Sequence, residues 1–267
     1  SECLSIGGTT TLNATCLPAG TYYLLISGAD DKAAFSGNVN LLQGTPPNPG
    51  IPLLAKVVLQ GAYNGANMNT TLRTNNLLPT AQPFNTAPFN YQGTETVANA
   101  AAIPTNAVDW VLIELRDDTN TNIVERRAAF VAANGDIIDT DGTIGVKFYT
   151  ITAGNTYNMA IRTRNHLAVV SRLAQTLPNT TAFDFTLPAN IQAGANQLVQ
   201  IGNVYVLKAG DINADGVINY ADFNAYIAPQ GSTTYTPADL NLNGNITIAD
   251  FDLFRQNASA IAVPAVR

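Results

Sequence analysis

The sequence predicts a mainly β protein, an antiparallel β-sandwich of the immunoglobulin-like type followed by a small α-helical module at the C-terminus. Three observations support this fold class. Short β-branched and aromatic runs recur between residues 53 and 187, and turn signals such as NG, DG and AGN separate them. Helical periodicity appears after residue 218. Residues 210–222 read GDINADGVINYAD, and residues 238–250 nearly repeat them as ADLNLNGNITIAD.

Residues 1–43 are interpreted as an N-terminal strand segment. TYYLLISG, residues 21–28, is apolar on both faces, and a hairpin of this length needs a larger sheet to be stable in water. Cys3 and Cys16 are close enough in sequence to staple that hairpin as a disulfide, the alternative being two free buried thiols. The larger sheet belongs either to the same chain or to a neighbouring copy. We expect strand exchange with a neighbouring copy, because a head-to-tail contact of this kind produces a filament.

Residues 44–50, GTPPNPG, form a proline-rich linker, and residues 51–208 are expected to form the sandwich. Its predicted strands lie in the runs 53–63, 107–117, 122–131, 143–151, 156–170 and 181–187. Residues 75–106 carry several prolines and almost no charge, which predicts a long ordered loop that wraps the sandwich. Within the second run, Trp110, Leu112 and Glu114 share one face of a strand, and we assign Trp110 to the core.

The acidic repeat has the spacing of EF-hand-type calcium loops. Calcium prefers about six to eight hard oxygen ligands, and such a loop offers them from positions 1, 3, 5, 7, 9 and 12, with a glycine at position 6 for the sharp turn. The predicted ligands of the first loop are Asp211, Asn213, Asp215, the carbonyl of Val217, Asn219 and Asp222. Those of the second loop are Asp239, Asn241, Asn243, the carbonyl of Asn245, Thr247 and Asp250. We therefore predict two bound calcium ions.

Apolar residues at fixed positions of the repeat predict how the loops and the following helices pack. Ile218 and Ile246 occupy position 8 of each loop, where their side chains can pack the two loops together. After the loops, Phe223 lies on one helical face with Ile227, and Phe251 lies on one face with Phe254. Residues 259–267 form a tail.

Residues 209–258 resemble a dockerin module, a duplicated calcium-loop and helix unit that has Asp at position 12. In cellulosomal dockerins, loop positions 10 and 11 contact a cohesin partner. Here these positions are Tyr220 and Ala221, then Ile248 and Ala249, in place of the Ser/Thr pair common in clostridial examples. The resemblance implies calcium binding, and it makes a cohesin-like protein one candidate partner.

A second resemblance covers much of residues 51–210. The segments QPFNTAPFNYQGTETV, VDWVLIELRD and IRTRNHLAVV are similar to a segment of large secreted surface proteins of Bacteroidota. This resemblance implies a surface-exposed β-rich module and assigns no reaction to it.

Charge and composition narrow the possible partners and the location. The formal charge is −6, from 19 acids and 13 bases, so nucleic acid and anionic membrane surfaces are poor partners. Six acids and no base lie between Lys208 and Arg255, which leaves 13 acids and 13 bases elsewhere, so the entire excess lies in the repeat. The sequence contains no uninterrupted run of 18 apolar residues, so we expect no membrane insertion. Few lysines, many Thr and Asn, and the cysteine pair favour a secreted, extracellular or cell-surface protein.

The sequence lacks the motifs of common hydrolases, so we expect no enzyme. GxSxG, HExxH and phosphate-loop motifs are missing, and His166 is the one histidine, which favours a structural role. A glycosidase would need paired carboxylates, for which the candidates are Asp109, Glu114 and Glu95, but the single Trp110 is a poor sugar platform. Lys56 and Glu114 lie in apolar strands, where they are either paired, solvent-facing or part of a Lys–Asn crosslink.

The sequence thus leaves two classes of function. We expect an extracellular structural or adhesive surface protein that assembles with copies of itself into a calcium-stabilised fibre or filament. The alternative is a cohesin-anchored or carbohydrate-binding accessory module of a secreted complex.

Overall fold

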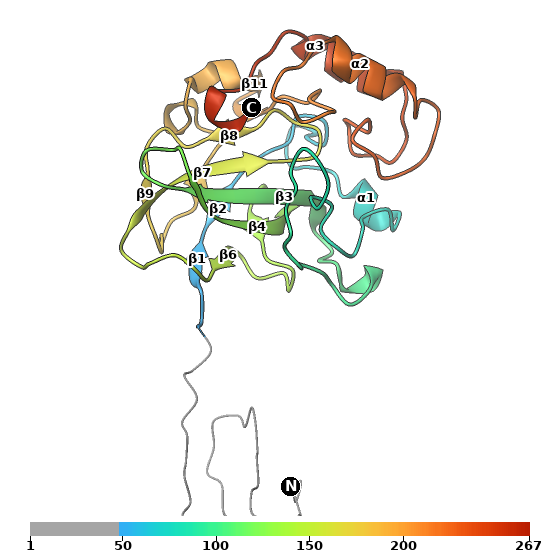
Figure 1. The fold of residues 1–267 in the computed structure, drawn as a ribbon. Coiled ribbons are helices and arrows are strands. Elements are labelled where there is room, and N and C mark those ends of the chain that lie inside the picture. The colour runs from blue at the N-terminus through green and yellow to red at the C-terminus, as the bar shows by residue number, and fades with distance from the viewer. Residues whose placement is uncertain (1–47) are drawn as a thin grey trace, which may run out of the picture. The chain divides into compact units, whose positions relative to one another are not determined.

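The computed structural model describes residues 48–267, which belong to one compact unit (Figure 1). The predicted strand segment, the Cys3–Cys16 disulfide and most of the predicted linker fall on residues 1–47, outside the described residues.

The main sheet is antiparallel and is centred on β3 (Ala107–Arg116) and β4 (Ile123–Ala132). Its strand order is β5 (Ile137–Ile138), β4, β3, β7 (Thr156–Arg162) and β8 (Val169–Val170), and β9 (Gln175–Thr176) also pairs with β7. Every residue of β3 is buried, which explains why its apolar residues occupy both faces instead of alternating with polar ones. Trp110 lies opposite Phe130 with ring centroids 4.0 Å apart, and its complete burial confirms its assignment to the core.

Three two-stranded sheets surround the main sheet. β1 (Ile51–Leu53) pairs with β6 (Val146–Phe148) in antiparallel orientation, and β2 (Ala55–Lys56) pairs with β10 (Phe183–Asp184) in parallel. The predicted strand over residues 53–63 is therefore broken into short pieces. β11 (Leu198–Ile201) and β12 (Val204–Leu207) form a hairpin that was not among the predicted strands.

The described residues are mainly β with few helices, and most of their strand pairs are antiparallel, as predicted. The finer immunoglobulin-like arrangement stays a prediction.

The loop over residues 75–106 packs on the main sheet, which confirms the predicted ordered loop. It follows the short helix α1 (Thr71–Thr74) and contains the 3₁₀ turn η1 (Ala100–Ala102). Its Phe84 is fully buried, and the carbonyl of Pro79 accepts a 2.9 Å hydrogen bond from Trp110 Nε1. The carbonyl of Phe89 accepts a 2.8 Å bond from Arg126 Nη1. These bonds satisfy loop backbone groups that burial would otherwise leave unpaired.

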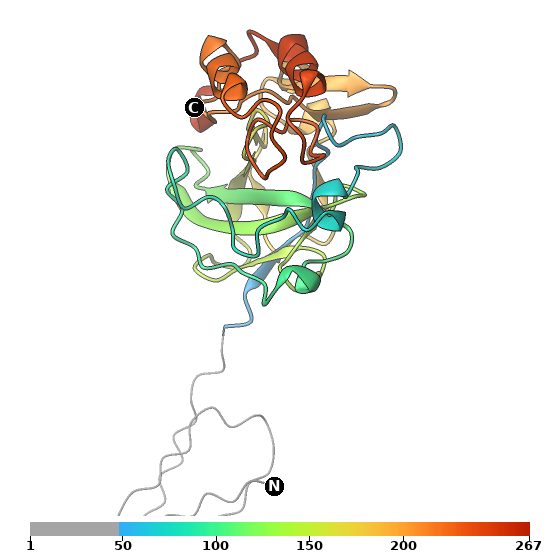
Figure 2. The same cartoon turned by 90° about the vertical axis from the view of Figure 1, so that its right-hand side faces the viewer.

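The C-terminal part carries two helices, α2 (Tyr220–Ile227) and α3 (Ile248–Asn257). Both views place them at the end of the unit that lies away from β1 (Figures 1 and 2). The 3₁₀ turns η2 (Pro188–Asn190), η3 (Gly194–Gln197) and η4 (Pro264–Val266) complete the helical structure of the described residues. None of the helices in residues 48–267 is long and apolar enough to cross a membrane.

A second apolar core joins these helices to β7, β8 and the tail. Ile218 and Ile246 are both buried in it, as position 8 of the repeat predicts. Their backbones pair with other segments instead of with each other, because Ile218 N–H donates to Ala260 and Ile246 N–H donates to Ser232. The tail and the segment before the second loop therefore each form an isolated β-bridge with one of the loops.

Candidate metal centre

The two acidic loops have the same backbone course. Position 4 is left-handed in both, with φ of 55° at Ala214 and 58° at Leu242, and position 6 is left-handed at Gly216 (82°) and Gly244 (85°). Glycine fits position 6 because a side chain is strained at such angles. A Cβ on Gly244 would also collide with Leu77 of the β-rich part. The repeat in the sequence is thus a repeat in conformation.

The carboxylate at position 1 is buried in each loop and accepts hydrogen bonds from the loop backbone. Gly216 N–H donates to Asp211 Oδ2 at 3.1 Å. In the second loop, Gly244 N–H donates to Asp239 Oδ2 at 2.8 Å, and Asn243 N–H donates to Asp239 Oδ1 at 3.0 Å. These bonds turn both carboxylates toward the interior of the loop that they begin.

The carboxylate at position 12 closes each loop. Asp222 Oδ1 accepts from Ile212 N–H at 2.7 Å, while its Oδ2 accepts from Asn219 N–H at 2.8 Å. Asp250 makes the same bonds, to Leu240 N–H and Thr247 N–H, both at 2.8 Å. Asn219 and Thr247 are also the N-caps of α2 and α3, and each forms a capping box with its aspartate. One carboxylate therefore fixes both the loop and the helix that follows it.

The remaining predicted ligands lie on the turns between these two carboxylates. Most of them accept backbone hydrogen bonds within their own loop, Asn213 from Asp215 N–H at 3.0 Å and Asp215 from Val217 N–H at 2.8 Å. The equivalent bonds of the second loop join Asn241 to Asn243 N–H, at 3.1 Å, and Asn243 to Asn245 N–H, at 2.7 Å. The Val217 carbonyl accepts from the Asn219 side chain at 3.1 Å, and the Asn245 side chain accepts from Thr233 at 2.8 Å.

The electrostatics of the first loop favour a bound cation. Burial, together with repulsion from Asp222 and Asp215, raises the pKa of Asp211 to about 7. Burial also raises the pKa of Asp222. In the second loop, burial raises the pKa of Asp239 to about 6, and the positive charge of Arg164 opposes this rise. A divalent cation would remove the penalty of holding these carboxylates charged in the protein.

The donor set fits calcium in chemistry, since it consists of carboxylate, amide, hydroxyl and carbonyl oxygens. Within residues 48–267, no three His, Cys, Asp or Glu side chains are grouped closely enough to hold a metal ion on their own. The loops would therefore have to draw on amide side chains and backbone carbonyls as well, as EF-hand-type loops do. Calcium would cross-link positions 1 to 12 of each loop when bound.

Buried polar side chains join the C-terminal part to the β-rich part, and the sequence did not single them out. Asn165 Nδ2 donates to the carbonyls of Pro237 and Asp239, at 3.1 and 2.7 Å. Asn257 of α3 donates to Gln60 Oε1 at 2.6 Å and to the Ala209 carbonyl at 2.7 Å. Asn165 follows Arg164 and Asn257 follows Gln256, so neither stands out in the sequence as a polar residue in an apolar run.

The three carboxylates considered for a glycosidase are each buried and paired with an arginine. Asp109 pairs with Arg164 at 2.7 Å, Glu114 with Arg116 at 2.6 Å and Glu95 with Arg127 at 3.2 Å. Glu114 is thus paired, one of the states expected for it, and its partner is Arg116. Lys56 is half-buried beside a small cavity that Asn134 also lines, which agrees with the solvent-facing alternative.

His166 is buried, and its Nδ1 lies 2.8 Å from Asn165 Oδ1. Burial and the charge of Arg164 lower the pKa of His166 to about 3, so the imidazole is neutral at physiological pH. Its place under the C-terminal part fits the structural role that we expected.

We predict that the chain does not hydrolyse polysaccharides or peptides, because its candidate acids are committed to buried ion pairs. Incubation with a substrate panel should release no product above the rate of a heat-inactivated sample. Turnover that is lost in Glu114→Gln or Asp109→Asn, while Asp252→Asn keeps it, would contradict this prediction.

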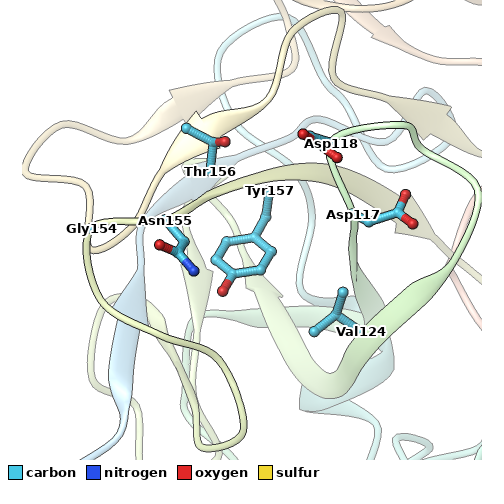
Figure 3. Close-up of a pocket in the computed structure, with 7 residues that line it drawn as sticks. All are labelled: Asp117, Asp118, Val124, Gly154, Asn155, Thr156 and Tyr157. Atoms are coloured by element: carbon cyan, nitrogen blue, oxygen red, sulfur yellow. The ribbon is translucent and has the colours of Figure 1, made fainter.

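A shallow cavity of about 410 Å³ lies between the end of β3 and the start of β7. Figure 3 shows Tyr157 in its middle, with Asp117 and Asp118 on one side and Asn155 on the other. Asp117 accepts three hydrogen bonds from its own turn, from Thr119, Thr121 and Asn122, and they lower its pKa to about 2. Tyr157 is buried, and its hydroxyl accepts from Thr152 N–H at 3.1 Å. This cavity therefore offers a sugar no free aromatic platform.

The helices present apolar side chains to solvent at equivalent positions. Tyr220, at position 10 of the first loop, is 71% exposed, and Ile248, at position 10 of the second, is 64% exposed. Ala221 and Ala249 follow them and are also exposed. The ring of Tyr220 lies 5.8 Å from that of Phe223, which in turn lies 5.8 Å from Phe251 across the two helices.

No protein-family model matches the chain, and no curated protein matches it. Solved structures that are similar include chains of two type II cohesin–X-dockerin complexes from Acetivibrio cellulolyticus, one an N-terminal and the other a C-terminal interface mutant. They share 14% and 15% sequence identity with this chain, at TM-scores of 0.39 and 0.37. Each match covers 80% of this chain and 98% of the other. Because the identities and TM-scores are this low, neither a partner nor an activity can be assigned to this chain from these structures.

Proposed function

We propose that the chain is a non-catalytic module of a secreted or cell-surface protein, and that its C-terminal part docks a cohesin-like protein. In this proposal two calcium ions hold the loops, the loops position α2 and α3, and the helices present the contact surface. The observation that carries it is the matched exposure of Tyr220 and Ile248 at position 10 of the two loops.

Exposed aromatic and aliphatic side chains at matched positions are a common mark of a protein interface. Each helix begins at its position 10, so the first residues of both helices face solvent together. The small Ala221 and Ala249 beside them leave room for a partner's backbone to approach. The dockerin resemblance of residues 209–258 supports a cohesin-like occupant, because positions 10 and 11 make the partner contacts in cellulosomal dockerins.

Self-assembly into a filament stays a prediction, because the segment proposed to exchange strands lies in residues 1–43, outside the described residues. Carbohydrate binding has less support, because the cavity between β3 and β7 lacks a free aromatic platform. The compositional argument for a secreted protein applies to each of these functions.

Changing both exposed anchors should abolish docking. In the presence of calcium, Tyr220→Asp combined with Ile248→Asp should weaken binding to the best of a panel of immobilised cohesin domains by at least about 100-fold, because buried apolar anchors dominate interface energies. Surface plasmon resonance measures the affinity, and calorimetry should show unchanged calcium uptake. Leu173→Asp is the matched control, since Leu173 is 69% exposed and lies outside the C-terminal helices.

Two outcomes would contradict the proposal. One is a double variant that binds as tightly as the native chain. The other is a native chain that binds no cohesin domain of the panel in calcium. Light scattering on the native chain alone distinguishes docking from self-assembly. Long assemblies that form without a partner would favour the filament.

A further inference from the structure

The two calcium loops share a backbone but differ in charge. Position 5 is Asp215 in the first loop and Asn243 in the second, so the first loop contains three carboxylates and the second contains two. The charge count of its ligands is one property by which such a loop sets its calcium affinity. On charge count, we expect the first loop to be the stronger site.

The second loop also has a cation beside it, supplied by the β-rich part of the chain. Arg164 is 4% exposed, and its Nη2 lies 3.9 Å from Asp239 Oδ2, at position 1 of this loop. This Nη2 is a buried nitrogen without a hydrogen-bond partner among the described residues. The positive charge at Nη2 is therefore balanced by no hydrogen bond and faces the Asp239 carboxylate.

Arg164 cannot easily move away from this position. Its Nε donates to Asp109 Oδ2 at 2.7 Å, and its Nη1 donates to the carbonyl of Thr236. The guanidinium also lies over the ring of Tyr235, 4.3 Å from the centroid, and the Tyr235 hydroxyl donates to Asp109 Oδ1 at 2.8 Å. A buried network thus fixes the cation before any metal arrives.

Among the described residues, no buried arginine forms an ion pair with a carboxylate of the first loop. Arg162 Nη1 donates to the Val266 carbonyl at 3.1 Å, and Arg267, which packs beside Gly216, is exposed. Within the described part of the chain, neither arginine forms an ion pair with Asp211. Asp211 therefore faces the repulsion of Asp215 and Asp222 with weaker compensation than Asp239 receives.

We propose that Arg164 is a built-in counter-ion of the second loop, so that this loop keeps its shape without calcium, whereas the first loop depends on calcium. This inference rests on the proposed function, because it takes both loops to be calcium sites. The same positive charge repels an incoming cation, so the second loop should bind calcium at least about tenfold more weakly. A form with calcium in the first loop alone should then exist over a range of concentrations.

Hydrogen exchange of the native chain in chelator tests the difference directly. Equivalent amides can be compared, because Ile212 and Gly216 donate to carboxylates in the first loop as Leu240 and Gly244 do in the second. We expect the first pair to exchange fast in chelator and slowly in calcium, and the second pair to exchange slowly in both. Equal exchange of the two pairs in chelator, or faster exchange of the second, would overturn the inference.

Swapping the residue types at position 5 of the two loops gives a matched pair of variants. Asn243→Asp should raise the calcium affinity of the second loop at least about tenfold, and Asp215→Asn should lower that of the first by a similar factor. Arg164→Met should make the second loop exchange fast in chelator, while Arg162→Met leaves it protected. If Arg164→Met fails to fold, the exchange of the native chain in chelator decides.

Calorimetry separates failure of this inference from failure of the proposed function. Two calcium ions that bind with equal affinity would overturn the inference alone. No calcium uptake by either loop would overturn the proposed function.

Discussion

Chelation of calcium is expected to loosen the C-terminal part of the chain at a temperature at which the β-sheets remain folded. The physical reason is the burial of Asp211, Asp222, Asp239 and Asp250, whose charges repel each other most strongly in the first loop. A site with free calcium at 100 times its Kd contributes about 2.7 kcal/mol to stability, and this contribution disappears in chelator. Because position 12 also caps each helix, loss of loop structure should destabilise the helix that follows.

The chain offers separate reporters for its two parts. Trp110 is the one tryptophan and lies in the core of the main sheet, so its fluorescence follows the unfolding of the sheet. Hydrogen exchange over residues 211–257 follows the loops and helices. In chelator we expect exchange to increase over the first loop and α2, residues 211–227, while the second loop stays protected and the melting curve of Trp110 changes little.

Alanine at position 1 of the loops should reproduce the effect of chelator. Asp211→Ala with Asp239→Ala removes a ligand from each loop, so added calcium should no longer raise the melting temperature of residues 211–257. Asp252→Ala is the matched control, because Asp252 is an acid of α3 outside both loops. Calorimetry that detects no calcium uptake by the native chain, or a melting profile unchanged by chelator, would contradict the prediction.

Asp109→Ala should lower the free energy of unfolding by about 3 to 5 kcal/mol, the usual effect of removing one partner of a buried ion pair. Asp109 is fully buried on β3, where it accepts from Arg164 and from the Tyr235 hydroxyl. Its removal leaves the guanidinium buried without its main counter-ion. Because Tyr235 leads into the second loop, the variant should also loosen the contact between the main sheet and that loop.

Chemical denaturation of the full chain in calcium measures this effect. Asp252→Ala breaks an exposed pair with Arg255 and should change stability by less than about 1 kcal/mol. Asp109→Asn keeps the shape and removes the charge, so its stability should fall between those of Asp109→Ala and the native chain. A stability of Asp109→Ala within about 1 kcal/mol of the native value would contradict the assigned role of the pair.

Local patterns in the sequence predicted the conformation of the acidic repeat closely. Loop positions 1, 6 and 12 interact over a dozen consecutive residues, so their spacing alone specifies a glycine turn, a capping carboxylate and a following helix. Both helices, both position 6 glycines and the burial of Ile218 and Ile246 follow these expectations. The strands β3 and β4 were also predicted closely, because long apolar runs between turn residues specify buried strands.

Other elements were harder to predict, for identifiable reasons. The predicted strands omit the β11–β12 hairpin, although LVQIGNVYVL has a Gly202–Asn203 turn between two apolar runs. The 53–63 run contains enough apolar residues for one strand, but its backbone groups pair in turn with β6, β10 and Leu207. Pairing partners far away in sequence cut it into short pieces.

The sequence by itself determined the two loops, their helices and the apolar residues at position 10, because all of these depend on neighbours within about a dozen residues. The tertiary structure alone decided which buried acids accompany Arg164. Arg164 looks no different in sequence from Arg162, yet the fold places it between Asp109 of β3 and Asp239 of the second loop. The reason is physical: a charge that leaves water must be compensated, but any opposite charge that the fold brings within reach can do so, and no local spacing specifies which one.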